Sequence, residues 1–179
     1  RGVSNALSNI GNVYETTYDF NKAIDYYEKS AEVKDNIDDK EGLSVVMDNI
    51  GNLYYKQRFL EKSIDSYKKS AELNEQLNMQ DNLGSNYNKL GVAYYKMGNY
   101  DEAENYYEKS LEVKQETGNK KDASMTYNNL GNLNLDKSKY KKAITYYEKS
   151  LKLKDDIDYT YGQAVSLHNM GNAYRQLNI

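Results

Sequence analysis

The sequence lacks cysteine, proline and tryptophan, and it contains only two phenylalanines and one histidine. Without cysteine, disulfide bonds and thiol chemistry are excluded. Without proline, no helix is kinked or ended early by a residue that lacks a backbone N–H. The one histidine, His168, has no cysteine and no second histidine with which to share a metal ion. We therefore expect no metal site and no cofactor.

An excess of one charge and long apolar runs are also missing. The 179-residue chain has a formal net charge of −3, and no apolar run approaches the roughly 18 residues of a membrane span. Neither nucleic acid nor a membrane is therefore expected as a partner. No phosphate-cradling glycine loop and no nucleophile elbow occurs, so we expect no enzymatic activity. No secretory signal segment precedes the pattern, and the expected location is cytoplasmic.

Glycine, in contrast, recurs at one fixed interval of forty residues, at positions 11, 51, 91, 131 and 171. Each of these glycines lies in a near copy of the motif Asn49-Ile50-Gly51-Asn52. A fixed period of this size is typical of a solenoid. We predict a single array over residues 1–179, with repeats near 1–39, 40–79, 80–119 and 120–159 and a final helix at 160–179.

Apolar residues within each repeat follow a helical step, as at Leu7, Ile10 and Tyr14, and a second such run follows after a short break. Each repeat is therefore predicted to be a pair of helices. In the third repeat, Gly98 is expected to end one helix in a left-handed conformation and Asn99 to cap the next helix through its side chain. The predicted helices are 2–16, 20–36, 40–57, 60–77, 80–97, 100–117, 120–136, 140–156 and 160–177.

The third repeat resembles the tetratricopeptide repeat (TPR) in the order and spacing of Tyr87, Leu90, Gly91, Tyr94, Gly98, Asn99, Tyr100, Ala103 and Tyr107. The resemblance covers the whole chain, although the family's common repeat is shorter, at about 34 residues. Extended repeats of this kind are similar to those of Pins/LGN-type adaptors, of kinesin light chains and of sensory regions in bacterial regulators. The resemblance implies a right-handed superhelical α-solenoid of stacked helix-turn-helix units that binds other proteins.

Two columns of asparagine are predicted on the first helix of each repeat, opposite its buried stripe. The first column is Asn9, Asn49, Asn129 and Asn169, and the second is Asn12, Asn52, Asn132 and Asn172. Each amide offers two donors and an acceptor, so a row of them could pair with the backbone of an extended peptide. The resemblance implies such an asparagine ladder for the first column. The alternative is that these asparagines only solvate a helix face or cap local backbone groups.

Three lysines lie beside these columns in the two middle repeats, at Lys56, Lys89 and Lys96. They favour an acidic or phosphorylated segment as the partner. The alternative is that they are ordinary solvated lysines. Lys89 and Val92 interrupt the two asparagine columns in the third repeat.

Two functions follow from these patterns. The first is a scaffold that binds an extended peptide segment of a partner protein in a concave groove through the asparagine ladder. The alternative is a regulatory, sensory or self-associating segment of a larger signalling protein. Two features favour this alternative: the pattern is already under way at Arg1, and the final helix carries apolar residues between 165 and 174 with no second helix after it. They predict self-association through the C-terminal helix.

Overall fold

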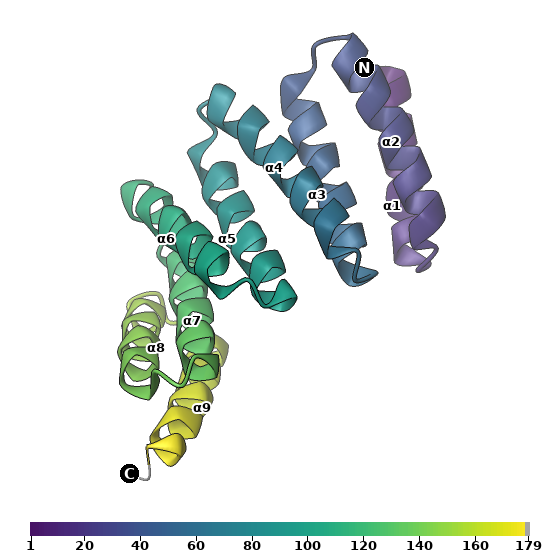
Figure 1. The fold of residues 1–179 in the computed structure, drawn as a ribbon. Helices are drawn as coiled ribbons and strands as arrows, with labels where there is room; N and C mark the ends of the chain where they lie inside the picture. Colours follow the sequence, from purple (N-terminus) through teal and green to yellow (C-terminus); the bar gives the residue numbers. More distant parts are fainter. Residues whose placement is uncertain (178–179) are drawn as a thin grey trace.

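A computed structural model describes residues 1–177, which fold into nine α-helices that follow one another along a row (Figure 1). The helices are α1 Gly2–Thr16, α2 Phe20–Asn36, α3 Lys40–Lys56, α4 Leu60–Gln76, α5 Gln80–Met97, α6 Tyr100–Glu116, α7 Lys120–Asp136, α8 Tyr140–Asp155 and α9 Thr160–Gln176. The predicted all-α solenoid of helix-turn-helix repeats is confirmed. Several helices end one residue earlier than predicted, because the residue that follows already belongs to the turn.

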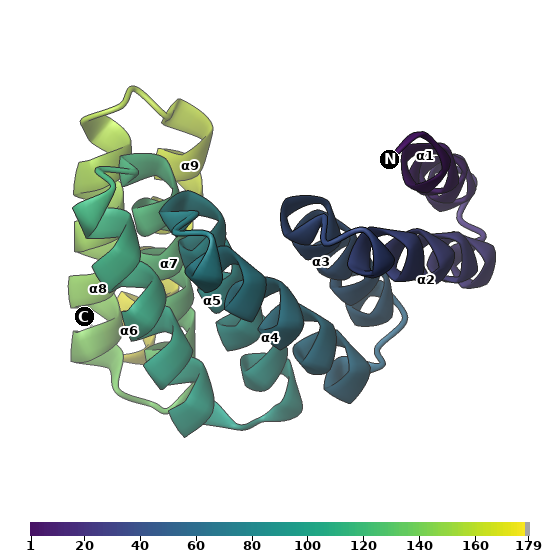
Figure 2. The same cartoon turned by 90° about the horizontal axis from the view of Figure 1, so that it is seen from above.

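The helices form antiparallel pairs that stack side by side, and the row of pairs bends into an arc with α1 and α9 at its two ends (Figure 2). The first helices of successive repeats contact one another directly, α5 with α7 and α7 with α9. First helices that lie this close to one another occupy the inner side of the arc, and the second helices cover its outer side (Figure 2). Side chains that project from the first helices away from their partners therefore share one inner surface.

A close contact between a glycine and a tyrosine ring joins the two helices of each repeat. The tyrosines are buried, and they are Tyr27, Tyr67, Tyr107 and Tyr147. A methyl group placed on Gly51 would lie 2.6 Å from the ring of Tyr67, and Gly91 faces Tyr107 in the same way. The forty-residue glycine therefore marks the point where the first helix packs directly on an aromatic ring.

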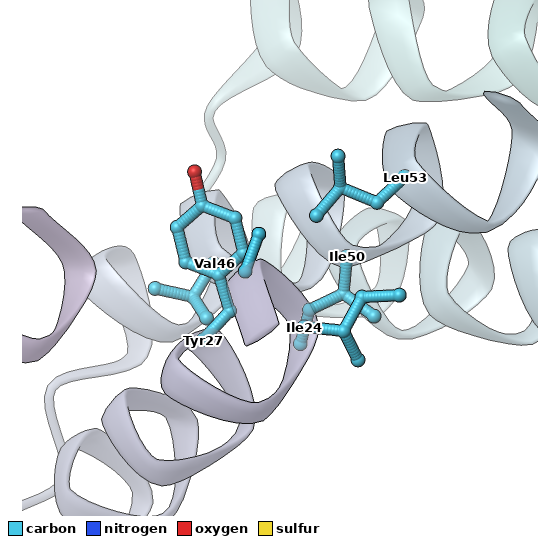
Figure 3. Packing of buried hydrophobic residues seen from close by; sticks show 6 residues of the cluster. Ile24, Tyr27, Val46, Ile50 and Leu53 are labelled. Atoms are coloured by element: carbon cyan, nitrogen blue, oxygen red, sulfur yellow. The ribbon is translucent and has the colours of Figure 1, made fainter. Parts of the chain in front are cut away.

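Successive repeats are joined by an apolar core that the second helix of one repeat shares with the first helix of the next. Between the first two repeats, Ile24 and Tyr27 of α2 pack with Val46, Ile50 and Leu53 of α3 (Figure 3). All five side chains are buried. Because each repeat covers the apolar face of its neighbour, stability is shared along the row.

In each repeat a buried serine of the second helix forms a further contact with the first helix, through a hydrogen bond. Each hydroxyl donates a hydrogen bond of 2.7 to 2.8 Å to a carbonyl of the first helix. The four donors are Ser30, Ser70, Ser110 and Ser150. These bonds satisfy polar groups that the thin core would otherwise bury without partners.

One residue in every turn adopts the left-handed conformation, and these residues recur every twenty positions, at Tyr18, Asp38, Arg58, Asn78, Gly98, Gly118, Ser138 and Asp158. Gly98, with φ +81°, confirms the predicted helix end. The side chain of Asn99 makes no capping hydrogen bond, so that part of the prediction was wrong. The turn is instead closed by the backbone, where the N–H of Asn99 donates to the carbonyl of Tyr94 at 3.0 Å. The same backbone bond recurs at Asp19 and Asp39.

The glycine–tyrosine contact makes a direct prediction for stability. The substitution Gly51→Ala should lower the free energy of unfolding by about 1–3 kcal/mol, because its methyl group overlaps the ring of Tyr67. Gly171→Ala is the matched control, since nothing lies within 4 Å of a methyl group there. This control should be neutral or gain up to about 1 kcal/mol from helix propensity. Urea unfolding of both variants measures the difference, and equal effects at the two glycines would contradict the contact.

Candidate functional site

The first asparagine column lies where the first helices of successive repeats meet. Asn129 donates from Nδ2 to Oδ1 of Asn88 at 3.0 Å, and Asn169 donates from Nδ2 to Oδ1 of Asn128 at 3.3 Å. Each of these NH₂ groups therefore donates a hydrogen bond to the preceding repeat. Asn9 is exposed and Asn49 is half-buried. Within residues 1–177, the Oδ1 atoms of all four column residues accept no side-chain or turn hydrogen bond.

Lys89 stands in the first column of the third repeat, and it makes the same kind of contact with the repeat before it. Its ammonium donates to both carboxylate oxygens of Asp48, at 2.7 and 2.6 Å. Three successive junctions therefore carry the same bond, from residue 89 to 48, from 129 to 88 and from 169 to 128. We call this set the junction row. It holds neighbouring repeats in register on the inner side of the arc.

The second asparagine column has a different role, because it accepts hydrogen bonds from the buried tyrosines. Tyr67 donates to Oδ1 of Asn52 at 2.9 Å, and Tyr147 donates to Oδ1 of Asn132 at 2.9 Å. Tyr27 donates to Oδ1 of Asn12 in the same way. These bonds support the core of the first, second and fourth repeats.

The second column makes further contacts within and between repeats. Oδ1 of Asn132 also accepts from Nδ2 of Asn169 in the next repeat at 3.3 Å. Asn52 donates to Asp48 at 3.2 Å. Oδ1 of Asn172 accepts from Arg175 one turn further along α9. More amide groups of the second column than of the first are therefore already engaged in hydrogen bonds within the protein.

Burial raises the pKa of each tyrosine in this arrangement, because an ionised phenolate would lose its hydration. The hydroxyls accordingly stay protonated and remain hydrogen-bond donors. In the third repeat Val92 replaces the asparagine, and burial raises the pKa of Tyr107 as well. Where it is present, the asparagine of the second column thus accepts a hydrogen bond from the same tyrosine whose ring contacts the glycine.

Two of the three predicted lysines are paired with carboxylates. Lys56 of α3 forms an ion pair of 2.8 Å with Glu15 of α1, and Lys89 is held by Asp48. Lys96 is exposed, and its ammonium lies 5.7 Å from the ring centre of Tyr95. The hydroxyl of Tyr95 in turn donates to Asp136 of the next repeat. The positive charge expected at the centre of the surface is therefore partly neutralised.

Sequence reasoning missed a column of buried polar residues on the second helices. Its members are Lys34, Asn74, Lys114 and Lys154, forty residues apart, and at most 5% of each is exposed. Lys34 pairs with Asp39 at 3.1 Å, and Lys114 pairs with Asp122 at 3.0 Å. A lysine on an amphipathic helix is normally assigned to the surface. The only sequence feature that could have revealed this column is its forty-residue period.

Lys154 differs from the other two lysines of this column. Its ammonium donates to the hydroxyl of Ser166 at 2.8 Å, and no carboxylate of the described residues lies within ion-pair distance. Burial lowers the pKa of Lys154, because the charged form loses hydration without gaining a counterion. The residues that correspond to Asp39 and Asp122 in the fourth repeat are Tyr159 and Gly162.

Two further findings concern metals and membranes. Across residues 1–177, no group of three or more histidine, cysteine, aspartate or glutamate side chains could hold a metal ion. None of the helices in that part of the chain is both long enough and apolar enough to cross a bilayer.

Paired helices of 15 to 18 residues, a glycine–tyrosine contact in each pair and a shared inner surface define a helical-repeat solenoid. The tetratricopeptide repeat family matches residues 2–76, 44–116, 82–156 and 122–178, and the chain belongs to this family. Such repeats are generally protein–protein interaction modules, and they are typically scaffolds without catalytic activity. No curated protein matches the sequence.

Solved structures share this fold at low sequence identity. BtubC from P. vanneervenii is 18% identical with a TM-score of 0.83, over 96% of this chain and 72% of that one. A signal transduction ATPase from Pyrococcus horikoshii with a tetratricopeptide repeat sensor is 20% identical with a TM-score of 0.87, over 96% of this chain and 27% of that one. The apo form of RapI is 14% identical with a TM-score of 0.84, over 99% of this chain and 69% of that one. These likenesses show the fold, and the finer resemblance to Pins/LGN-type adaptors stays a prediction.

The unpaired ammonium of Lys154 predicts an unusual gain in stability. Lys154→Met should raise the free energy of unfolding by about 1–3 kcal/mol at pH 7, because it removes a buried charge that has no counterion. Lys114→Met is the matched control, and it should lower the free energy of unfolding by a similar amount because it removes the bonds to Asp122 and Ser85.

The pH dependence of the Lys154→Met effect provides a second test. Burial holds the folded-state pKa of Lys154 below the ordinary lysine value of 10.5, so the unfolded chain binds more protons between these two values. The destabilisation caused by Lys154 is therefore complete at low pH and fades as the pH rises toward 10.5. Urea unfolding of wild type and variant at pH 7 and pH 10 should show a smaller difference at pH 10. A difference that is constant or grows would contradict the account.

Proposed function

We propose that this protein is a scaffold that holds an extended segment of a partner protein along the inner side of the array. Asn9, Asn49, Asn129 and Asn169 pair with the backbone of that segment. The observation that carries the proposal is the junction row, in which Asn129 and Asn169 are oriented by the preceding repeat while their Oδ1 atoms accept no side-chain hydrogen bond from residues 1–177. Asn9 and Asn49 occupy the same position in the first two repeats without such a bond. An oriented acceptor on a half-buried surface binds a peptide N–H without first losing rotamer freedom.

Selectivity for side chains is weaker than the sequence suggested, since Lys56 and Lys89 are already paired with carboxylates. An acidic residue of the segment is best placed opposite Lys96, whose ammonium is exposed. We therefore rest the proposal on recognition of the backbone, with an acidic preference as a second contribution. A neutral segment should still bind.

The proposal is tested with a peptide selected from a random extended library on the wild-type protein. Changing one column asparagine to alanine should weaken its binding by roughly 2- to 10-fold, which corresponds to one hydrogen bond of about 0.5–1.5 kcal/mol. Changing all four should weaken binding further, without strict additivity. Fluorescence anisotropy measures the dissociation constants.

Asn105→Ala is the matched control for this series, because Asn105 is an exposed asparagine on the second helix α6. It should leave peptide binding unchanged. A quadruple variant of residues 9, 49, 129 and 169 that remains folded by circular dichroism and binds the peptide as tightly as wild type would refute the ladder.

A second proposal is that the array associates with itself as a regulatory segment of a larger signalling protein. The observation that favours it is the apolar surface of α9, where Tyr161, Val165 and Leu167 are 75%, 36% and 51% exposed. Tyr161 and Val165 lie four positions apart and therefore share one face of α9, whereas Leu167 lies on another face. Exposed apolar side chains that share a face are typical of protein interfaces. Light scattering should then show a mass that rises with concentration, and Val165→Glu should abolish the rise. A strictly monomeric wild-type protein would rule this proposal out.

A further inference from the structure

A pocket opens between the second helices α6 and α8, over the first half of α7. Its volume is about 470 Å³, a size typical of sites that take a small ligand or a large side chain. None of its lining residues belongs to the junction row or to either asparagine column. The pocket is therefore separate from the surface proposed above for the extended segment.

Three positions distinguish this pocket from the same place in other repeats. The equivalent pocket eighty residues earlier contains Leu43, and its volume is about 140 Å³. Ala123 replaces that leucine here, and its shorter side chain contributes to the larger volume. Gly118 replaces Asp38, which removes a carboxylate from the lining. Lys152 stands where the other second helices carry glutamate, at positions 32, 72 and 112. These differences make the pocket both wider and more positive.

The floor of the pocket is apolar and belongs to the core. Ala123 is buried, and Tyr127 of α7 and Leu153 of α8 are half-buried. All three pack in the core cluster that joins the third and fourth repeats. A ligand with an apolar group that covers this floor gains the free energy of removing apolar surface from water.

Two lysines without counterions stand at the rim of the pocket. Lys149 and Lys152 lie three positions apart on one face of α8, and both are exposed. Within residues 1–177, neither forms an ion pair. The other two lysines of the lining are already paired with carboxylates, at 3.0 Å for Lys114 and 2.9 Å for Lys120. Two positive charges are therefore available to a ligand.

The surroundings of the pocket also favour an anionic group. Residues 120–159 contain nine lysines and six acidic residues, although the whole chain has a net charge of −3. The hydroxyl of Tyr127 accepts a hydrogen bond from Nε2 of Gln115 at 3.0 Å, so its own hydrogen can point to a carboxylate of the ligand. The ammonium of Lys149 lies 5.6 Å from the ring centre of Tyr127, above the floor. Apolar and anionic groups of one ligand can thus be bound side by side.

We propose that this pocket binds an acidic segment of a second partner protein, which inserts one large apolar side chain. The side chain covers Ala123, Tyr127 and Leu153, and the carboxylates beside it pair with Lys149 and Lys152. Because the pocket shares no residue with the asparagine columns, the array can hold this partner and the extended segment at the same time.

Other ligands fit this pocket less well. An uncharged apolar segment would bring no counterion to the two lysines of the rim. The phosphate backbone of a nucleic acid is bound by several cations along its path, and only two unpaired lysines stand here. The corresponding groove between α4 and α6 carries Glu112 at the position of Lys152, so it disfavours an acidic segment. We therefore expect one such site in the part of the chain that the structure describes.

The test starts from random peptides displayed on phage and selected on the wild-type protein, with soluble Ala123→Leu variant present in excess as a competitor. The variant carries the leucine of Leu43 and Leu83, so it should keep the fold while narrowing the pocket. Peptides that bind elsewhere, including the inner surface, are removed by the competitor. The surviving peptides should share a large apolar residue flanked by aspartate or glutamate.

Dissociation constants from fluorescence anisotropy then separate the apolar and the charged contributions. Ala123→Leu should weaken the binding of a selected peptide by at least about 10-fold, because its apolar side chain loses its place. Lys152→Glu introduces the residue of the other second helices and should weaken binding by about 3- to 10-fold. Lys141→Glu is the matched control, since it makes the same change of charge on α8 outside the lining. It should change binding by less than about 2-fold.

Each outcome decides for or against the pocket, independently of the asparagine ladder. Loss of affinity in Ala123→Leu and Lys152→Glu, with Lys141→Glu unchanged and all three variants helical by circular dichroism, establishes the site. No surviving peptide, or surviving peptides without acidic residues, overturns it. Equal losses in Lys152→Glu and Lys141→Glu indicate only a general attraction of lysines for anions, and they also overturn the proposal.

Discussion

The contact between a glycine of the first helix and a tyrosine ring of the second sets the geometry of every complete repeat. Because the glycine has no side chain, the ring lies directly against the backbone of the first helix, and burial keeps its hydroxyl protonated. In the second and fourth repeats that hydroxyl donates to an asparagine of the first helix, from Tyr67 to Asn52 and from Tyr147 to Asn132. The motif that contains this glycine thereby determines the spacing of the two helices. The asparagine that follows the glycine in this motif belongs to the second column, and in these repeats its Oδ1 is already occupied by the tyrosine hydroxyl.

The spacing within a repeat also determines how repeats meet. Once the second helix lies at a fixed distance, its apolar face packs on the first helix of the next repeat, as at Ile24 and Ile50. First helices of successive repeats then come close enough for residues 41 positions apart to bond, as Asn129 and Asn88 do. The polar side chains of the inner surface are consequently linked by hydrogen bonds between repeats rather than independent of one another. Side chains that are held in this way before a partner binds lose less conformational entropy on binding.

Much of the fold could be predicted from the sequence, because the information repeats every forty residues. The five glycines and the helical spacing of apolar residues were sufficient to place all the helices to within a residue. The turns could not be predicted in the same way, because six of the eight left-handed residues are not glycine, Arg58 and Tyr18 among them. In these turns the closing backbone hydrogen bonds impose the left-handed conformation, and the type of residue at the position does not indicate it.

The inner surface could be predicted only in part. Placing Asn129 and Asn169 on one helix face required only the helical period, but their donation to Asn88 and Asn128 depends on how closely the repeats stack. The lysine pairs with Glu15 and Asp48 join different repeats, so sequence proximity could not indicate them. Burial of Lys114 and Lys154 contradicts the ordinary preference of lysine for the surface, and it follows only from the packed structure.

The central claim is that the first asparagine column forms the surface that a bound polypeptide contacts. The most direct measurement is a heteronuclear NMR titration of the assigned asparagine side-chain amides with a peptide selected on the wild-type protein. The account predicts that the amide resonances of Asn9, Asn49, Asn129 and Asn169 shift the most, while that of Asn105 on α6 stays unchanged. A peptide that binds while these four resonances stay in place, and that shifts amides of the second helices instead, would contradict the account.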